Sequence, residues 1–136
     1  MKDRTEKGFT LIELMMALGI MGILAVVAAG YFGDSAVSAK RTDARAGLQT
    51  TAITLEKCKS LYGSYNSANC SITNGSSVPS HDGLYSIAVT SAASTFTLTA
   101  TPSSGSSQNN DSNCTSLILN NLGKQSGTGS DPTTCW

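Results

Sequence analysis

A single carboxylate lies inside the long apolar segment near the start of the chain. Glu13 stands in the run "FTLIELMM", and it is the only charged residue between residues 9 and 33. An ionised carboxylate in the hydrocarbon of a membrane is costly, so such a residue predicts a functional site with a partner of opposite charge. No Lys or Arg follows within helical reach. The nearest positive group would be a new amino terminus at Phe9, if the chain were cut after Gly8.

This amino terminus gives Glu13 a specific expected role. An ammonium group on Phe9 would lie one helical turn from Glu13, and it could pair within the chain or with Glu13 of a neighbouring copy. A buried charge without its partner is heavily penalised, whereas a complete pair is tolerated. We therefore expect Glu13 to be unsatisfied in an isolated subunit and satisfied beside another, as a register device for helix assembly.

The rest of the sequence offers little for catalysis or metal binding. It contains one histidine, His81 in the stretch "PSHDG", which we expect to be an exposed turn residue. No second carboxylate lies near Glu13, and the four cysteines form no CxxC pair of the kind that binds zinc. We predict that the protein is not an enzyme and has no metal and no cofactor.

The four cysteines predict disulfides instead. An even number of cysteines in a Ser/Thr-rich region behind a membrane segment indicates an oxidising compartment. Three pairings are possible, and we favour Cys58–Cys70 with Cys114–Cys135 because both close short loops. In the chain-entropy model each bond contributes roughly 3 kcal/mol.

The element that carries Glu13 is predicted to be a membrane helix. The apolar run from residue 9 to residue 32 would cover about 36 Å as a helix. This exceeds the roughly 30 Å hydrocarbon core of a bilayer, and the run is too long for a cleaved secretory signal. Lys2, Arg4 and Lys7 precede it and place the amino terminus in the cytoplasm.

The helix is predicted to continue beyond the membrane segment as an amphipathic helix. Six residues spaced three or four apart would share one face: Ala44, Leu48, Thr51, Leu55, Cys58 and Tyr62. Gly63 follows the last of them, as a helix-ending glycine should. We predict one helix from Phe9 to near Leu61, with the basic stretch at residues 39–48 on a solvated face.

The remainder of the chain predicts a small antiparallel sheet laid on this helix. In residues 85–90 and 95–101 an apolar row alternates with a row of Ser, Thr or Ala, and the short stretch "SAAS" between them suits a hairpin. A third strand would run through Leu117 and Leu119, and a fourth could form around Lys124. The expected fold class is α+β, with three or four strands packed on a long helix.

The stretch from Gly8 to Glu13, with its charged leader and the apolar run behind it, resembles the type IV prepilin family. The resemblance implies that a membrane prepilin peptidase cleaves after Gly8 and methylates the amino group of Phe9. Glu13 of one subunit would then meet the Phe9 amine of another. Residues 1–8 would be the leader, residues 9–33 the transmembrane and filament-core segment, and residues 34–136 a periplasmic head.

The carboxyl-terminal half carries a finer resemblance. The stretches "GLYSIAV", "TFTLTATP", "CTSLILNNLGKQSGTG" and the final "CW" are similar to the type IVa pilins, and most of all to PilE-type minor pilins. The Cys114–Cys135 loop corresponds to the disulfide-bounded loop of such pilins, while Cys58–Cys70 would be an extra bridge. Gly30 stands where many pilins have a proline, so the helix need not kink there.

These features predict a structural subunit of a type IV pilus, most closely a PilE-like minor pilin that aids pilus initiation. The alternatives are a major pilin, a type II secretion pseudopilin and a competence pilin for DNA uptake. The expected partners are other pilin subunits, the prepilin peptidase, the inner-membrane assembly machinery and the membrane itself. The precursor would reside in the bacterial inner membrane and the mature form in the extracellular pilus, where adhesion and twitching motility are further possible roles.

Bulk charge predicts no nucleic-acid partner. Behind the leader the chain has six Lys or Arg and seven Asp or Glu residues, and only Lys124 follows the predicted helix. Electrostatic binding of DNA needs several cations close together. On bulk charge we therefore expect no binding to nucleic acid, and a small basic patch at a filament tip is the alternative that this count leaves open.

Overall fold

The structure is a computed structural model that describes residues 8–136, with the backbone alone for residues 29–34. The predicted leader thus lies outside the described residues, except for Gly8. The chain divides into two compact units, Met1–Ala36 and Val37–Trp136. Each unit is described by itself.

One helix contributes to both units. Helix α1 runs from Leu11 to Tyr62, which confirms the predicted continuous helix, and Gly30 lies within its helical backbone. In the first unit, the span Leu11–Ala28 is long and apolar enough to cross a membrane, by its length and composition. The helix ends where expected: Gly63 has a φ of 75°, and its N–H donates to the carbonyl of Lys59 at 2.8 Å.

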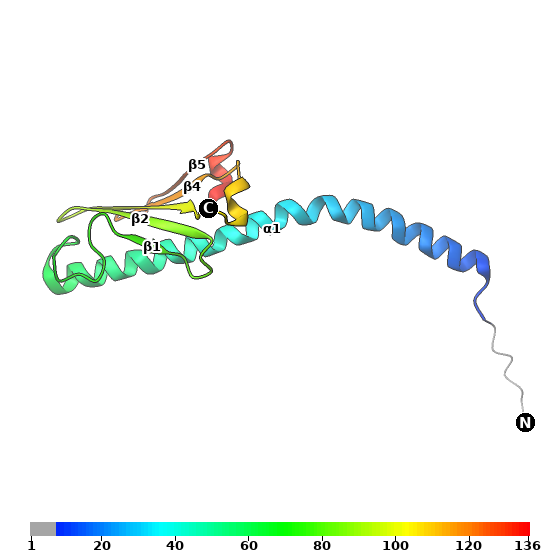
Figure 1. Cartoon of the computed structure of the whole chain (residues 1–136), viewed down its shortest axis with the longest axis horizontal. Coiled ribbons are helices and arrows are strands. Elements are labelled where there is room, and N and C mark those ends of the chain that lie inside the picture. Colours follow the sequence, from blue (N-terminus) through cyan, green and yellow to red (C-terminus); the bar gives the residue numbers. More distant parts are fainter. Residues whose placement is uncertain (1–7) are drawn as a thin grey trace, which may run out of the picture. The chain divides into compact units, whose positions relative to one another are not determined.

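The second unit, which we call the head, contains a five-stranded antiparallel sheet in chain order (Figure 1). Its strands are β1 (Ser77–Pro79), β2 (Tyr85–Ser91), β3 (Phe96–Pro102), β4 (Ser116–Asn120) and β5 (Gln125–Thr128). The predicted α+β fold is confirmed, with five strands where three or four were expected. The missed strand, β1, has three residues and ends in a proline, which a sheet tolerates at an edge.

The core lies between the sheet and the second half of α1. Leu48 and Leu55 of the helix are fully buried, as are Ile87 of β2 and Leu98 of β3. The helix approaches the sheet closely at Gly47, where an added Cβ atom would lie 2.7 Å from Cδ1 of Ile87. The predicted apolar face is therefore the packed face, and its last member, Tyr62, is 49% exposed.

Candidate functional site

Glu13 caps the start of its own helix. The backbone N–H and the hydroxyl of Thr10 donate to Oε2 of Glu13 at 3.3 and 3.2 Å, and the N–H of Glu13 donates back to the Thr10 hydroxyl at 3.4 Å. This arrangement is a capping box. These bonds use part of the hydrogen-bonding capacity of the carboxylate but supply no positive charge, so the role of Glu13 as a register device stays a prediction. A carboxylate accepts about four hydrogen bonds, so these leave capacity for a partner's ammonium group.

The two residues at the predicted cleavage site are open. Phe9 is 88% exposed, and among the described residues no atom beyond its chain neighbours lies within 4 Å of a Cβ built on Gly8. Both precede the first turn of α1, so a peptidase could reach the bond between them without unwinding the helix. Cleavage at this bond and methylation of Phe9 remain predictions.

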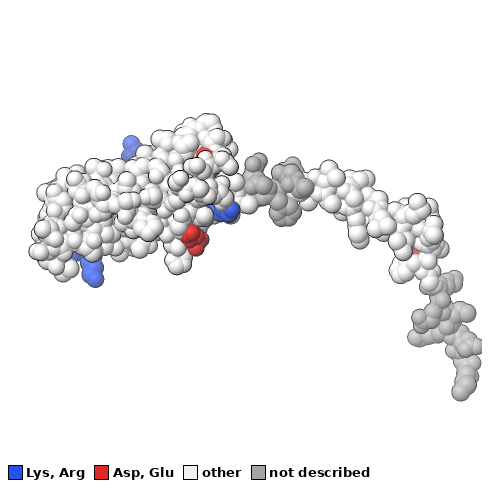
Figure 2. All heavy atoms as spheres, viewed as in Figure 1, with Lys and Arg blue, Asp and Glu red and all other residues white. Residues whose placement is uncertain are grey.

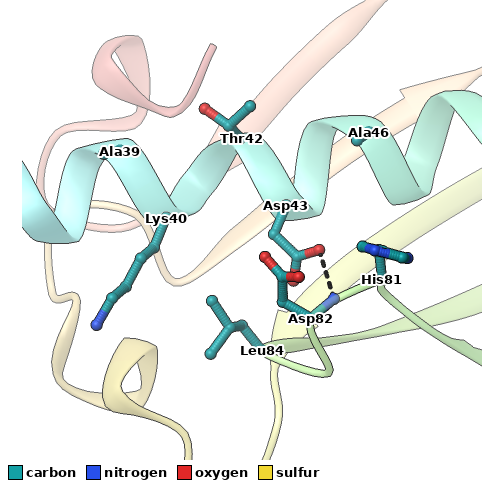
Figure 3. Close-up of a pocket in the computed structure, with 8 residues that line it drawn as sticks. All are labelled: Ala39, Lys40, Thr42, Asp43, Ala46, His81, Asp82 and Leu84. Atoms are coloured by element: carbon teal, nitrogen blue, oxygen red, sulfur yellow. Dashed lines mark hydrogen bonds between the residues drawn. The ribbon is translucent and has the colours of Figure 1, made fainter.

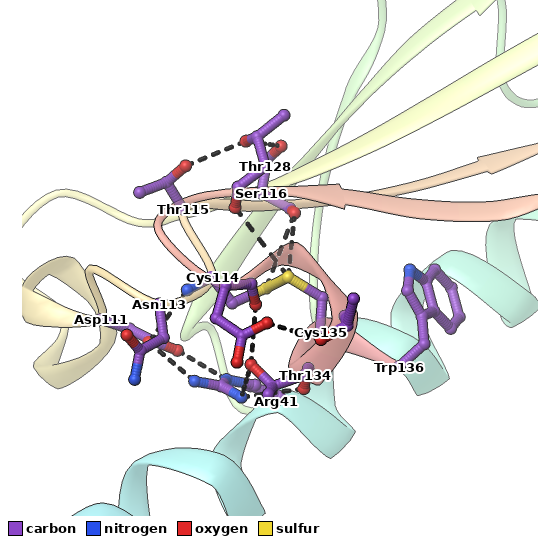
Figure 4. The surroundings of a disulfide bond; sticks show 12 residues. Arg41, Asp111, Asn113, Cys114, Thr115, Ser116, Thr128, Thr134, Cys135 and Trp136 are labelled. Atoms are coloured by element: carbon purple, nitrogen blue, oxygen red, sulfur yellow. Dashed lines mark hydrogen bonds and ion pairs between the residues drawn. A yellow bond between two sulfur atoms is a disulfide. The ribbon is translucent and has the colours of Figure 1, made fainter.

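The sequence predicted a solvated face for the basic stretch of the helix, residues 39–48. In the structure, Arg41 of this stretch is buried. Nε and Nη2 of Arg41 donate to the two carboxylate oxygens of Asp111 at 2.7 and 2.8 Å, and the two side chains are 6% and 2% exposed (Figure 4). Burial acts to raise the pKa of Asp111. The bonds from Arg41 and from the N–H of Cys114 outweigh it, so this pKa falls below its ordinary value.

Two helix arginines hold the carboxyl-terminal segment against α1. Nη1 of Arg41 donates to the carbonyl of Thr134 at 2.9 Å, and Nε of Arg45 donates to the carbonyl of Cys135 at 3.1 Å. Both acceptors belong to the short helix η2 (Pro132–Cys135). The structure contains a Cys114–Cys135 disulfide whose cysteines are both fully buried. The arginines thus fix the position of the loop that this disulfide closes.

The second disulfide, Cys58–Cys70, ties the end of α1 to the loop that follows it, with the two Cα atoms 5.5 Å apart. It forms one wall of a small cavity of about 260 Å³ beside Lys57. The loop between α1 and β1 is therefore fastened to the end of the helix at Cys70.

Asp43 fastens the loop between β1 and β2. It is 8% exposed, and it accepts a hydrogen bond from the Ser80 hydroxyl at 2.5 Å. It also accepts one from the N–H of Asp82 at 3.0 Å (Figure 3). His81 beside it is exposed, as expected, and lines a hollow of about 380 Å³. Within residues 8–136, no three His, Cys, Asp or Glu side chains gather as metal ligands would.

One end of the head, formed by residues 56–66, 92–96 and 120–124, collects three of its lysines. We call it the hairpin end, because the β2–β3 and β4–β5 hairpins both turn there. Backbone bonds join its parts: Tyr65 N–H to Ala93 carbonyl, and Asn121 N–H to Phe96 carbonyl, each at 3.2 Å. The rings of Tyr65 and Phe96 meet edge to face at 5.0 Å. Nζ of Lys59 lies 4.4 Å from the Tyr65 ring centre.

The charges of the two ends differ. The hairpin end carries Lys57, Lys59 and Lys124 with one acid, Glu56, which accepts the Tyr65 hydroxyl at 2.8 Å. Four acids lie at the opposite end: Asp43, Asp82, Asp111 and Asp131. There the cations are already engaged, and even Lys40 donates to the Ser107 hydroxyl at 2.9 Å. On the face that Figure 2 shows, Lys and Arg atoms lie apart and form no continuous patch.

Two family models match the chain. The prokaryotic N-terminal methylation motif covers residues 3–29. The model described as "Type IV minor pilin ComP, DNA uptake sequence receptor" covers residues 31–118, which is more than half of the chain. The chain belongs to this ComP family of type IV minor pilins. No curated protein matches it.

Membership of the ComP family refines the predictions made from the sequence. The resemblance to type IV pilins is confirmed, and the family is one of pilins rather than enzymes. The methylation motif coincides with the apolar start of α1, so the chain is a pilin processed at a membrane and assembled into a pilus. The matched family is the ComP minor pilins and not the PilE-type minor pilins that the sequence suggested.

The expectation that a nucleic-acid partner is absent is wrong. The finding that overturns it is the family match, because the family is described as a DNA uptake sequence receptor. Bulk charge was the wrong measure, since a sum over the chain cancels cations at one end of the head against acids at the other.

Proposed function

We propose that this chain is a minor subunit of a type IV pilus that binds DNA for uptake, with the hairpin end of its head as the binding surface. The match to the ComP family over residues 31–118 carries this proposal. It favours a competence pilin over a PilE-like minor pilin that aids pilus initiation. The sequence alone had offered the competence pilin only as an alternative. Nothing observed here favours a major pilin or a secretion pseudopilin.

The charge of the hairpin end supports this choice of surface. Lys57 and Lys124 are exposed, and Lys59 lies over an aromatic ring within reach of solvent. Each phosphate contact by a cation contributes about −0.9 to the slope of log affinity against log salt, so three lysines predict a slope of about −3. Such a term is modest, and base edges or DNA shape must supply the remaining affinity and the specificity.

The filament role rests on the first unit and on the methylation motif. Large apolar side chains from Leu11 to Val27 are exposed in the single chain, so a membrane or neighbouring helices must cover them. Cleavage after Gly8 would leave residues 9–33 as the membrane and filament-core segment and residues 34–136, which include the head, as the exported part. Other pilin subunits, the prepilin peptidase and the inner-membrane assembly machinery are the partners this role requires.

DNA binding can be tested with the full mature chain in detergent micelles and a fluorescent duplex titrated at several salt concentrations. We expect a slope of about −3, and replacing Lys57, Lys59 and Lys124 together with glutamine should lower the affinity at low salt about tenfold or more. Fluorescence anisotropy measures both quantities.

A matched pair of single variants provides the control for this test. Lys124→Gln and Lys40→Gln change the net charge equally, but they lie at opposite ends of the head. Only Lys124→Gln should weaken binding and reduce the slope by about one. Equal losses of DNA affinity in the two variants would show that DNA does not bind at the hairpin end. Binding that does not depend on salt would contradict contacts between lysines and phosphates.

A further inference from the structure

The turn between β4 and β5 presents an unusually exposed apolar side chain. Leu122 is 83% exposed, which makes it the most exposed large apolar residue of the head, residues 37–136. A single exposed leucine is ordinary on a protein surface and by itself indicates nothing. Here the rigidity of the turn and its electrostatic setting distinguish it.

The backbone of this turn is fixed by its own hydrogen bonds. The Asn120 side-chain oxygen accepts the N–H groups of Leu122 and Lys124 at 3.0 and 2.9 Å, and the Asn120 N–H donates to the Lys124 carbonyl at 3.3 Å. Gly123 supplies the left-handed conformation that the turn needs, with a φ of 72°. The leucine is thus held outward before any ligand binds, which reduces the entropy lost on binding.

The setting of Leu122 is cationic. Lys124 follows two residues later. The bond from Asn121 N–H to the Phe96 carbonyl holds the turn next to Phe96, whose ring contacts that of Tyr65, and Lys59 lies over the Tyr65 ring. An apolar protein partner would have to desolvate these lysines. A polyanion such as a DNA duplex would pair with these lysines, and Leu122 would then face the interior of the duplex.

We propose that Leu122 is an apolar wedge that enters the minor groove of the bound duplex and opens a base step, while Lys124 contacts a neighbouring phosphate. This inference rests on the proposed function. Leucine is among the side chains that proteins insert between base pairs, where they kink the duplex. The cost of opening a step depends on its sequence and is least at flexible pyrimidine–purine steps. A head with few cations would discriminate between sequences in this way.

The test uses the full mature chain in detergent micelles and a pool of end-labelled duplexes with a randomised centre. Wild-type protein should bend the duplexes, seen as a change in energy transfer between the labelled ends, and should enrich particular central steps. Leu122→Ala should abolish the bending and lower the enrichment at least fivefold, while the salt slope stays unchanged. Leu122→Met should retain both effects. Ile53→Ala, which removes an exposed apolar side chain from helix α1, should match wild type.

Three results would overturn the proposal. One is bending and enrichment by Leu122→Ala equal to wild type. Another is that Leu122→Ala binds DNA like wild type while cells that carry this variant have fewer filaments. That result would make the turn a contact between pilus subunits. If the wild-type chain itself binds no DNA, the proposed function fails and this inference with it. The first two results would leave the proposed function standing, because the wild-type protein would still bind. Melting curves should agree for all variants, since the substituted side chains are exposed.

Discussion

Replacing Arg41 with alanine is expected to lower the free energy of unfolding of the head by about 3–5 kcal/mol. The substitution leaves the carboxylate of Asp111, which is 2% exposed, without its bidentate partner. It also frees the carbonyl of Thr134, so the carboxyl-terminal segment keeps only the bond from Arg45 to the Cys135 carbonyl as its arginine attachment to α1. Urea unfolding followed by circular dichroism measures the change.

The comparison variant and the pH dependence make this prediction sharper. Lys40→Ala, one residue away on an exposed side chain, should cost less than about 1 kcal/mol. Because the folded pKa of Asp111 lies below the ordinary value of 3.8, the stabilisation is present above that value and is lost as pH falls through the lowered pKa. The difference between wild type and Arg41→Ala should therefore shrink in strong acid. An Arg41→Ala loss no larger than that of Lys40→Ala would contradict a structural role for the pair.

Replacing Glu13 with alanine is expected to reduce incorporation of the subunit into filaments by at least about tenfold, because a buried ammonium group would lose its partner. The measurement is the amount of the chain in sheared filaments relative to the amount in membranes. Expression in the membrane should not change, since the apolar span Leu11–Ala28 keeps its length.

Glutamine at position 13 separates the two roles that Glu13 could have. Glu13→Gln removes the charge, but its side chain can still cap the helix with Thr10. If the carboxylate pairs with the Phe9 amine of another subunit, Glu13→Gln should fail as badly as Glu13→Ala. Filaments at the wild-type level from Glu13→Gln would show that capping is its whole contribution.

Local patterns predicted much of the fold. The 3–4 spacing of residues such as Leu48 and Leu55 identified the packed face of α1, and Gly63 marked its end. Alternation identified β2 and β3, because each buries one row of side chains against the helix. Strand β1 was not predicted, because three residues that include a proline are too few to show an alternating pattern.

The roles of the helix charges could not be read from local sequence. Arg41 pairs with Asp111, 70 positions away, and Asp43 bonds to Ser80, 37 positions away. In the helix sequence alone, both charges look solvated. The lysines of the hairpin end were within reach of prediction. Once a hairpin joins residues 116–128 and the sheet order follows the chain, Lys124 must turn at the same end as the β2–β3 hairpin, beside the end of α1.

We propose that this pilin serves the filament as a DNA receptor rather than as a building block required for its formation. The most direct measurement deletes the gene and counts both surface filaments and DNA taken up by the cells. We expect filaments to remain in near-normal number while DNA uptake falls sharply. The wild-type gene should restore uptake, and the triple variant at Lys57, Lys59 and Lys124 should not. Unchanged uptake, or filaments lost in proportion to uptake, would contradict it.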